Sequence, residues 1–324
     1  MRWPWLPRRH AQRLLLRRVG TRLAFVLTDG APGEQPARLL RWGLLPGARP
    51  APAGKAIALL DPADYQILKV DTPNVPQEEL KAAARWQIKE LVDADLAELT
   101  LDVMHVGGDV ARAQRQLFVV AARNAAIQAL IEDLAEGLAE RIAVVDVWET
   151  ALRNLLAAQA RADGLAERAC AAVLLDAGLC LLVVCAGDEL FYTRRIEADP
   201  GLLARARGEP AHPAAELPLG FEYQPGGALP EESPLVVELQ RSIDVWERSW
   251  PELPLARLYV ASATHGAEVA ALIQRELGLR TLALDPLAAF AAERPAPEGE
   301  GEGDALAACI PLLGAALRTE NRQL

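Results

Sequence analysis

The sequence predicts an α/β protein with two domains. Its 324 residues exceed the usual size of one domain, so about two are expected, each large enough for its own hydrophobic core. Short runs rich in valine, isoleucine and leucine alternate with helical patterns, as they do in α/β chains. The runs in the first half are Ala56–Leu60, Tyr65–Val70, Leu99–Val106, Gln116–Ala121 and Ile142–Val147. The polar stretch Arg161–Glu167 is the expected boundary between a first lobe of residues 1–160 and a second of residues 168–324.

The composition is that of a soluble globular protein. Half of the residues are apolar and a quarter are charged, so the chain can bury enough surface to fold. The formal net charge of −10 is the wrong sign for a protein held mainly by nucleic-acid phosphates. Four irregularly spaced cysteines do not suggest a disulfide framework or a zinc site, so we predict reduced, buried thiols. They are Cys170, Cys180, Cys185 and Cys309.

No export signal or membrane-spanning helix is predicted. Arginines interrupt the short apolar runs of the N-terminus, and Asp176 and Gly178 break the longest apolar stretch, Ala169–Ala186. The arginine-rich start also carries Trp3 and Trp5. This mixture fits either contact with an anionic membrane surface or a solvated basic tail, and the sequence leaves both open.

The clearest helix lies in the segment TPNVPQEELKAAARWQIKELV. Asn74 can cap it and Pro76 falls in its first turn. Its buried stripe is expected to be Leu80, Ala84, Ile88 and Leu91. A second helix is predicted for Asn124–Ala139, and a third begins after Trp148.

Three residues of the first helix are candidates for binding a partner. Arg85 and Lys89 belong to a basic ridge at i, i+4 spacing, and Trp86 lies beside small alanines. In one interpretation Trp86 packs between subdomains and the two basic residues are solvated. In the other, the helix forms part of a groove for a partner peptide, with Trp86 as its anchor. Both remain open, whereas core packing is the prediction for Trp246 and Trp250.

The second half of the chain begins with three closely spaced strands, which predict a hairpin or a meander. The strands are Ala171–Leu175, Leu181–Cys185 and Leu190–Arg194. An irregular segment, Pro200–Pro234, follows, and then helix and strand patterns alternate up to Leu284. Pro295–Asp304 is predicted as an acidic, glycine-rich loop, and the apolar stretch Ala305–Arg318 is expected to dock on a lobe.

The compact motifs of phosphate-loop, dinucleotide, zinc-protease and serine-hydrolase sites are absent from the sequence. The four histidines are scattered singly, so no metal or catalytic cluster is predicted from spacing. We therefore expect no catalytic residues and no metal ligands.

Several segments resemble one family. They are YQILKVDTPNVPQEELKAAARWQIKELV, LLDAGLCLLVVCAGDELFYTRRI, LQRSIDVWE and LLGAALR. Together they resemble the MSHA pilus biogenesis protein MshI and its relative PilM of type IV pili, over residues 59–318. The resemblance implies an α/β, actin-like (ribonuclease H-like) fold of two lobes, with an extra subdomain at Asp61–Ile142 in the first. It also implies a cytoplasmic protein, held at the inner membrane by partners, that binds the cytoplasmic N-terminal segment of a PilN-like pilus assembly protein.

Actin-like ATPases hold nucleotide phosphates with two glycine turns, each carrying an acidic residue that orients magnesium. The first candidate turn is Arg18-Val19-Gly20-Thr21, in which arginine replaces the acid; a guanidinium repels a metal ion. The second turn keeps its acid and glycine, but Leu179 and Cys180 follow in place of hydroxyl residues. The remnant of a nucleotide site is therefore Arg18, Gly20, Asp176, Gly178 and Gly266. The same Asp176 turn is equally explained as an ordinary tight turn, for which aspartate and glycine are favoured.

Three functions follow from these observations. The first is a scaffold of MSHA-like or type IV pilus assembly with a degenerate nucleotide site, without catalysis or a cofactor. The second is a slow ATPase or ATP-dependent switch of the same machinery, which would use ATP and magnesium. The third is the cytoplasmic domain of a type II secretion platform protein.

Overall fold

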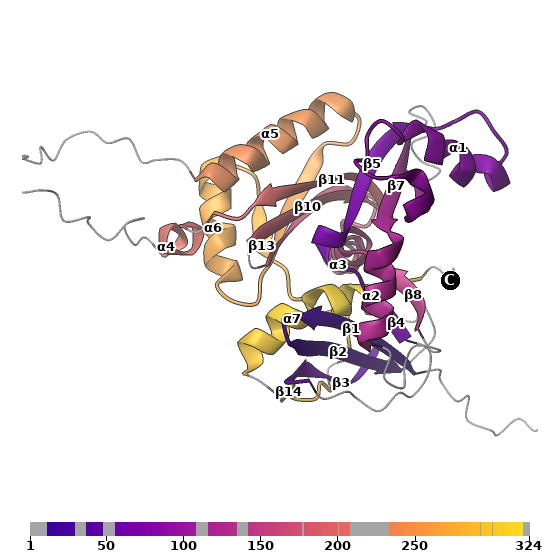
Figure 1. Ribbon diagram of the computed structural model, residues 1–324. Helices are drawn as coiled ribbons and strands as arrows, with labels where there is room; N and C mark the ends of the chain where they lie inside the picture. The colour runs from indigo at the N-terminus through magenta and orange to yellow at the C-terminus, as the bar shows by residue number, and fades with distance from the viewer. Residues whose placement is uncertain are drawn as a thin grey trace, which may run out of the picture.

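The computed structural model describes residues 12–29, 37–47, 56–107, 116–134, 142–176, 178–199, 201–207, 233–291, 293–299 and 301–319. They form two lobes, each built on a mixed β-sheet, with two helices between the sheets (Figure 1). Within this part of the chain no helix is both long and apolar enough to cross a membrane.

Both sheets follow the same plan. Three antiparallel strands form a meander, and further strands join the first of them in parallel. The first sheet has the order β14 (Glu298–Gly299), β3 (Arg38–Leu45), β2 (Arg22–Asp29), β1 (Arg13–Val19), β4 (Ala56–Leu59) and β8 (Ile142–Asp146). The second has the order β11 (Glu189–Glu197), β10 (Leu179–Ala186), β9 (Ala169–Asp176), β12 (Leu255–Ala261) and β13 (Thr281–Ala283). This repeated topology is the actin-like, ribonuclease H-like fold that the resemblance implies, and the predicted hairpin or meander is a meander.

The sequence interpretation missed the first three strands of the chain. Arginines occupy several positions of β1 and β3, so neither strand reads as a continuous apolar run, although both are largely buried. The arginine-rich N-terminus therefore consists of two parts. Residues 1–11, including Trp3 and Trp5, lie outside the described residues, whereas residues 13–22 belong to the β1–β2 hairpin.

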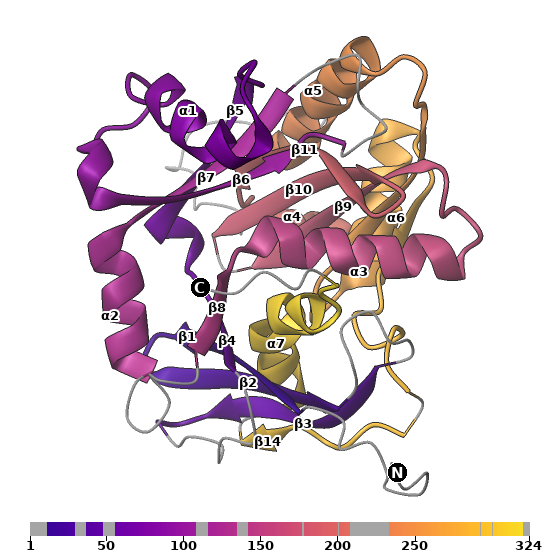
Figure 2. The same cartoon turned by 90° about the vertical axis from the view of Figure 1, so that its right-hand side faces the viewer.

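Helices α3 (Trp148–Ala162) and α7 (Glu302–Ala316) lie between the two sheets (Figure 2). Helix α3 contacts β9, β10 and β11, and α7 contacts β1, β2 and β3. The end of the chain thus returns to the first lobe, which differs from the expected second lobe of residues 168–324. The apolar composition of this C-terminal stretch predicted that it would be buried, but it did not indicate which of the two sheets the helix would pack against.

The tract expected to be an acidic loop is also attached to the first lobe. Its short strand β14 pairs with β3, and both carboxylate oxygens of Glu298 accept hydrogen bonds from Arg41, at 2.6 and 2.7 Å. Gly43 permits this pairing, because a Cβ atom there would lie 2.1 Å from the Glu298 carbonyl oxygen. Pairing with β3 therefore gives part of this tract a strand conformation, although its glycine and glutamate content predicted a loop.

An additional subdomain is inserted into the first lobe. Its sheet has the order β5 (Tyr65–Asp71), β7 (Gln116–Arg123) and β6 (Leu99–His105), and helix α1 (Leu80–Gln87) covers one face. Helix α2 (Asn124–Leu134) then leads back to the first sheet, against which Leu130, Ile131 and Leu134 pack. The insertion therefore ends near Arg123 and not at Ile142, which starts β8.

Helix α1 is shorter than expected. A 3₁₀ turn, Gln77–Glu79, precedes it, and Asn74 does not cap it. Leu80, Ala84 and Ile88 are buried as predicted, but Leu91 is 55% exposed. The helix ends at Gln87, so the helical spacing no longer places Leu91 on the inner face.

The outer surface of the second sheet carries α4 (Leu202–Ala206), α5 (Pro234–Ser249) and α6 (Gly266–Leu277). Trp246 and Trp250 are buried as predicted and pack edge-on against Phe191. Helix α4 falls within the segment expected to be irregular, most of which lies outside the described residues. All four cysteines are buried and unbonded, and burial raises the pKa of each thiol, so they stay protonated.

The two central helices cross at a glycine. A Cβ atom at Gly314 of α7 would lie 2.2 Å from the carbonyl oxygen of Ala151 in α3. Since the central helices join the lobes, this close approach contributes to how the lobes sit on one another.

We expect Gly314→Ala to lower the free energy of unfolding by about 1–3 kcal/mol, because the added methyl group overpacks the crossing. Gly303→Ala is the matched control in the same helix, since its methyl group would meet Thr264 at an ordinary 3.8 Å. This control should leave stability unchanged or raise it by up to about 1 kcal/mol, the helix-propensity gain. Urea unfolding of both variants measures the difference, and equal stabilities would contradict the close crossing.

Candidate functional site

The candidate site lies where the first strands of the two sheets end. The β1–β2 turn contains Gly20 at φ +60°, and the β9–β10 turn contains Gly178 at φ +82°. Both glycines lie in turns, as expected, and both adopt a backbone conformation that favours glycine. The same local geometry is thus present at equivalent places in the two lobes.

Arg17 joins the lobes at this point. Its guanidinium donates a hydrogen bond to the carboxylate of Asp176, at 3.1 Å, and a longer one to the carbonyl oxygen of Ala308, at 3.4 Å. It also stacks on the ring of Trp148, with 4.3 Å between the guanidinium carbon and the ring centroid. Arg17 is 7% exposed. A buried guanidinium is therefore the counter-ion of the carboxylate that was expected to orient a metal ion.

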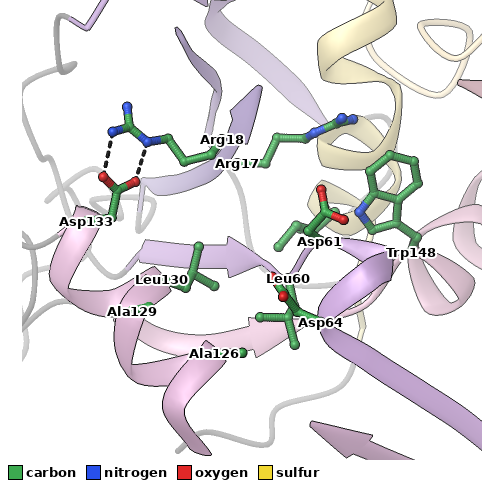
Figure 3. Close-up of a pocket in the computed structure, with 11 residues that line it drawn as sticks. Arg17, Arg18, Leu60, Asp61, Asp64, Ala126, Ala129, Leu130, Asp133 and Trp148 are labelled. Atoms are coloured by element: carbon green, nitrogen blue, oxygen red, sulfur yellow. Dashed lines mark hydrogen bonds and ion pairs between the residues drawn. The ribbon is translucent and has the colours of Figure 1, made fainter. Parts of the chain in front are cut away.

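Arg18, the arginine that the sequence placed at the remnant site, points elsewhere. Its side chain forms a two-pronged ion pair with Asp133 of α2 (Figure 3). Side chains alternate along a strand, so Arg17 faces α3 and α7 with Leu15, whereas Arg18 shares the α2 face with Leu14 and Leu16. This alternation was visible in the sequence, but it could be applied only once β1 was recognised as a strand.

Gly266 is the third predicted glycine of the remnant site. It starts helix α6, directly after His265, which has the left-handed φ of 56°. A Cβ atom at Gly266 would meet Ala283 at 3.6 Å, an ordinary contact, so no close approach requires glycine here. The structure thus pairs Asp176 with an arginine, and nothing in the packing around Gly266 requires a glycine.

The residues at the cleft do not fit magnesium-bound nucleotide. Asp176 is engaged by Arg17, and Arg18 stands where a second acidic group belongs. A divalent ion placed at Asp176 would be repelled by the Arg17 guanidinium, whereas the Arg18 side chain points away toward Asp133. The backbone N–H groups of the two turns are the feature that still suits a phosphate.

A second contact, centred on a fully buried carboxylate, also connects the lobes. Glu149, at the start of α3, is 0% exposed and pairs with Arg195 of β11, with 2.9 Å between a guanidinium nitrogen and the carboxylate. The hydroxyl of Tyr65 donates to the same carboxylate at 2.5 Å and accepts from the backbone N–H of Trp148. Burial, together with the charge of Glu149, raises the pKa of Tyr65 well above its ordinary value, so the hydroxyl keeps its proton. The insertion, α3 and the second lobe meet at this cluster.

A pocket of about 240 Å³ lies beside these contacts, between β1, the end of β4, helix α2 and the start of α3 (Figure 3). Its lining combines apolar, acidic and basic groups. The lining residues are Arg17, Arg18, Leu59, Leu60, Asp61, Asp64, Ala126, Ala129, Leu130, Asp133 and Trp148. Sequence reasoning identified only Arg18 of this set, because the rest come from four separate segments that meet only in the fold.

Two of the candidate partner-binding residues, Arg85 and Trp86, lie on α1, and Lys89 lies in the turn that follows it; none of the three lines this pocket. Trp86 is 69% exposed, so the interpretation that it packs between subdomains is wrong. Arg85 donates hydrogen bonds to the carbonyl oxygens of Leu96 and Leu99, the latter at 3.1 Å, and so fastens the helix to its sheet. Lys89 is exposed.

Comparison with known proteins supports the fold. No protein-family model and no curated protein sequence matches the chain. The solved PilM-PilN type IV pilus biogenesis complex matches with a TM-score of 0.66 and 18% identity, covering 97% of this chain and 100% of that one. The cytoplasmic domain of EpsL, an inner-membrane component of the Vibrio cholerae type II secretion system, gives a TM-score of 0.44 and 12% identity, over 93% and 95%. A Bacteroides thetaiotaomicron protein of unknown function with an actin-like ATPase fold gives 0.44 and 8%, over 93% and 97%. The match to the PilM-PilN complex shows that the chain shares that fold, in agreement with the actin-like topology of its two sheets, and an identity of 18% shows no more than the fold.

We expect Arg195→Met to destabilise the protein by about 3–5 kcal/mol, because it leaves the buried Glu149 carboxylate without its counter-ion. Arg161→Met is the matched control, since the Arg161–Asp188 pair is largely exposed and should contribute less than about 1 kcal/mol. Chemical denaturation of the two variants tests this expectation. A loss below about 1 kcal/mol for Arg195→Met would show that the cluster does not hold the lobes together.

Proposed function

We propose that this protein is a cytoplasmic scaffold of a type IV pilus or MSHA-like assembly system. In this role it binds the cytoplasmic N-terminal segment of a PilN-like inner-membrane protein, which would hold it at the membrane. The observation that carries the proposal is the likeness to the PilM of a PilM-PilN complex along nearly the whole of both chains. The sequence segments that resemble MshI favour the MSHA branch of this family.

We further propose that the nucleotide site is degenerate and that the protein is not an ATPase. The Arg17 guanidinium supplies the positive charge next to Asp176 that a magnesium ion would otherwise supply. Catalysis of phosphoryl transfer depends on positioned metal ions and charge stabilisation, and this pairing removes one acidic anchor. The lobes are then held by side chains of the chain itself.

A slow ATPase or ATP-dependent switch is the second candidate function. The observation in its favour is that Gly20 and Gly178 keep turns with left-handed glycine geometry at equivalent places. Backbone N–H groups in such turns can hold phosphate oxygens.

Helix α1 supplies the proposed partner surface. Trp86 is the most exposed of the large apolar side chains that the structure describes, and the exposed Lys89 lies in the turn that follows the helix. Tryptophan is enriched among the residues that dominate interface energies, so an exposed tryptophan is a suitable anchor for a partner. Arg85 holds the helix in place and acts on the surface only indirectly.

Titration with Mg-ATP separates the scaffold from the switch. A ligand at a hundredfold excess over its Kd adds about 2.7 kcal/mol of stability, which thermal denaturation detects readily. We expect no shift of the melting temperature with millimolar Mg-ATP and no phosphate release. A concentration-dependent rise in melting temperature would favour the switch.

Binding of the partner segment tests the α1 surface. The probe is a fluorescent synthetic peptide with the N-terminal sequence of the PilN-like protein encoded beside this chain. We expect Trp86→Ala to weaken binding tenfold or more, as for an interface anchor. Val245→Ala, which truncates an exposed apolar side chain on α5, should leave the affinity unchanged.

Unchanged affinity of the Trp86→Ala variant would remove helix α1 from the partner surface. Failure of the peptide to bind the unsubstituted protein would contradict the proposed function itself.

A further inference from the structure

The pocket beside the cleft carries negative charge that the protein does not neutralise. Of its lining groups, Arg18 is paired with Asp133, and Arg17 is paired with Asp176. The remaining charged groups are Asp61 and Asp64, and no cation among the described residues forms an ion pair with either. Partial burial, together with the charge of Asp61, raises the pKa of Asp64 above its ordinary value, as expected for neighbouring carboxylates without a counter-ion.

A buried donor in the same pocket also has no acceptor. Trp148 is 3% exposed, and its indole Nε1–H makes no hydrogen bond to any residue that the structure describes. Figure 3 shows the indole nitrogen on the edge of the ring that faces Asp61. Buried donors are nearly always satisfied, so an unsatisfied one that lines a cavity points to an acceptor supplied from outside.

The remaining wall suits an aliphatic chain. Leu60 lies at the end of β4, and helix α2 contributes Ala126, Ala129 and Leu130. The two alanines leave the space open where longer side chains would fill it. A group with an apolar stem, a cationic end and a nearby hydrogen-bond acceptor would therefore complement the whole lining.

We propose that this pocket binds a lysine or arginine side chain of the partner segment. The cationic end pairs with Asp61 and Asp64, the stem lies on Leu60 and the α2 alanines, and a carbonyl oxygen of the segment accepts from Trp148. This inference rests on the proposed function and adds to it the chemistry by which the segment is recognised. Since Trp148 also stacks on Arg17, the bound segment would lie next to the contact that joins the lobes.

The test uses the peptide described above, with its N-terminus acetylated so that its cations are side chains alone. The protein variant is Asp61→Asn/Asp64→Asn. Asparagine keeps the side-chain oxygen of residue 61 that accepts from the Ala63 N–H, so the local turn is preserved. Glu78→Gln, which removes an exposed charge from the turn before α1, is the matched control.

We expect the double variant to bind the peptide at least tenfold more weakly, and Glu78→Gln to bind like the unsubstituted protein. Each lysine or arginine of the peptide is replaced by glutamine in turn, and one of these replacements should weaken binding to the unsubstituted protein as much as the double variant does. Combining that replacement with the double variant should weaken binding little further, because both changes remove the same interaction. In addition, the peptide should shift the indole N–H resonance of Trp148, identified by its loss in Trp148→Phe.

Several results would overturn the inference. If the peptide binds the unsubstituted protein and the double variant within twofold of one another, the pocket does not recognise a cation, and the proposed function stands. If the losses of affinity from the protein variant and from the peptide replacement simply add, the carboxylates do not contact that basic residue. If the Trp148 resonance does not move, the peptide does not enter the pocket. Either result shows that the pocket is not the binding site. Absence of any binding to the unsubstituted protein contradicts the proposed function as well as this inference.

Discussion

The guanidinium of Arg17 lies where the two lobes meet, and its contacts there involve both lobes and both central helices. It bonds Asp176 at the end of β9, reaches the α7 backbone at Ala308 and stacks on Trp148 at the start of α3. A buried charge is costly unless it is paired, so these partners must stay together. The positions of the β1–β2 and β9–β10 turns are thereby coupled through a side chain of the protein. In our account this coupling replaces a bound nucleotide and makes the molecule a docking platform.

Two further features act in the same direction. The Glu149 cluster ties the insertion and the second lobe to α3, and Gly314 brings α7 close to that helix. Of the groups that join the lobes, Arg17 and the Trp148 ring on which it stacks also line the pocket. One wall of the pocket is therefore fixed by buried contacts, whereas Trp86 lies on a helix of the insertion with its side chain exposed. Rigid walls suit recognition of a fixed chemical group, and an exposed tryptophan suits a broader contact.

Much of the second lobe could be predicted from the sequence, because its first strands are apolar runs separated by Asp-Ala-Gly and Ala-Gly-Asp turns. Two of the first three strands, β1 and β3, contain arginines within the strand, and those arginines make contacts only after folding; β2 carries an uninterrupted apolar run that the sequence interpretation missed. The same limit affected the candidate site: Arg18 was chosen by its place in a turn pattern, but strand alternation directs Arg17 to the cleft. The position of α7 depends on tertiary packing that an apolar pattern does not specify. The pocket draws on four segments far apart in the chain, which no local pattern brings together.

A crystal structure determined after soaking with Mg-ATP tests the central claim most directly. Our account predicts that the Arg17 guanidinium remains on the Asp176 carboxylate, with no triphosphate between the two glycine turns. Density for a triphosphate and its divalent ion in that space, with Arg17 displaced from Asp176, would contradict it.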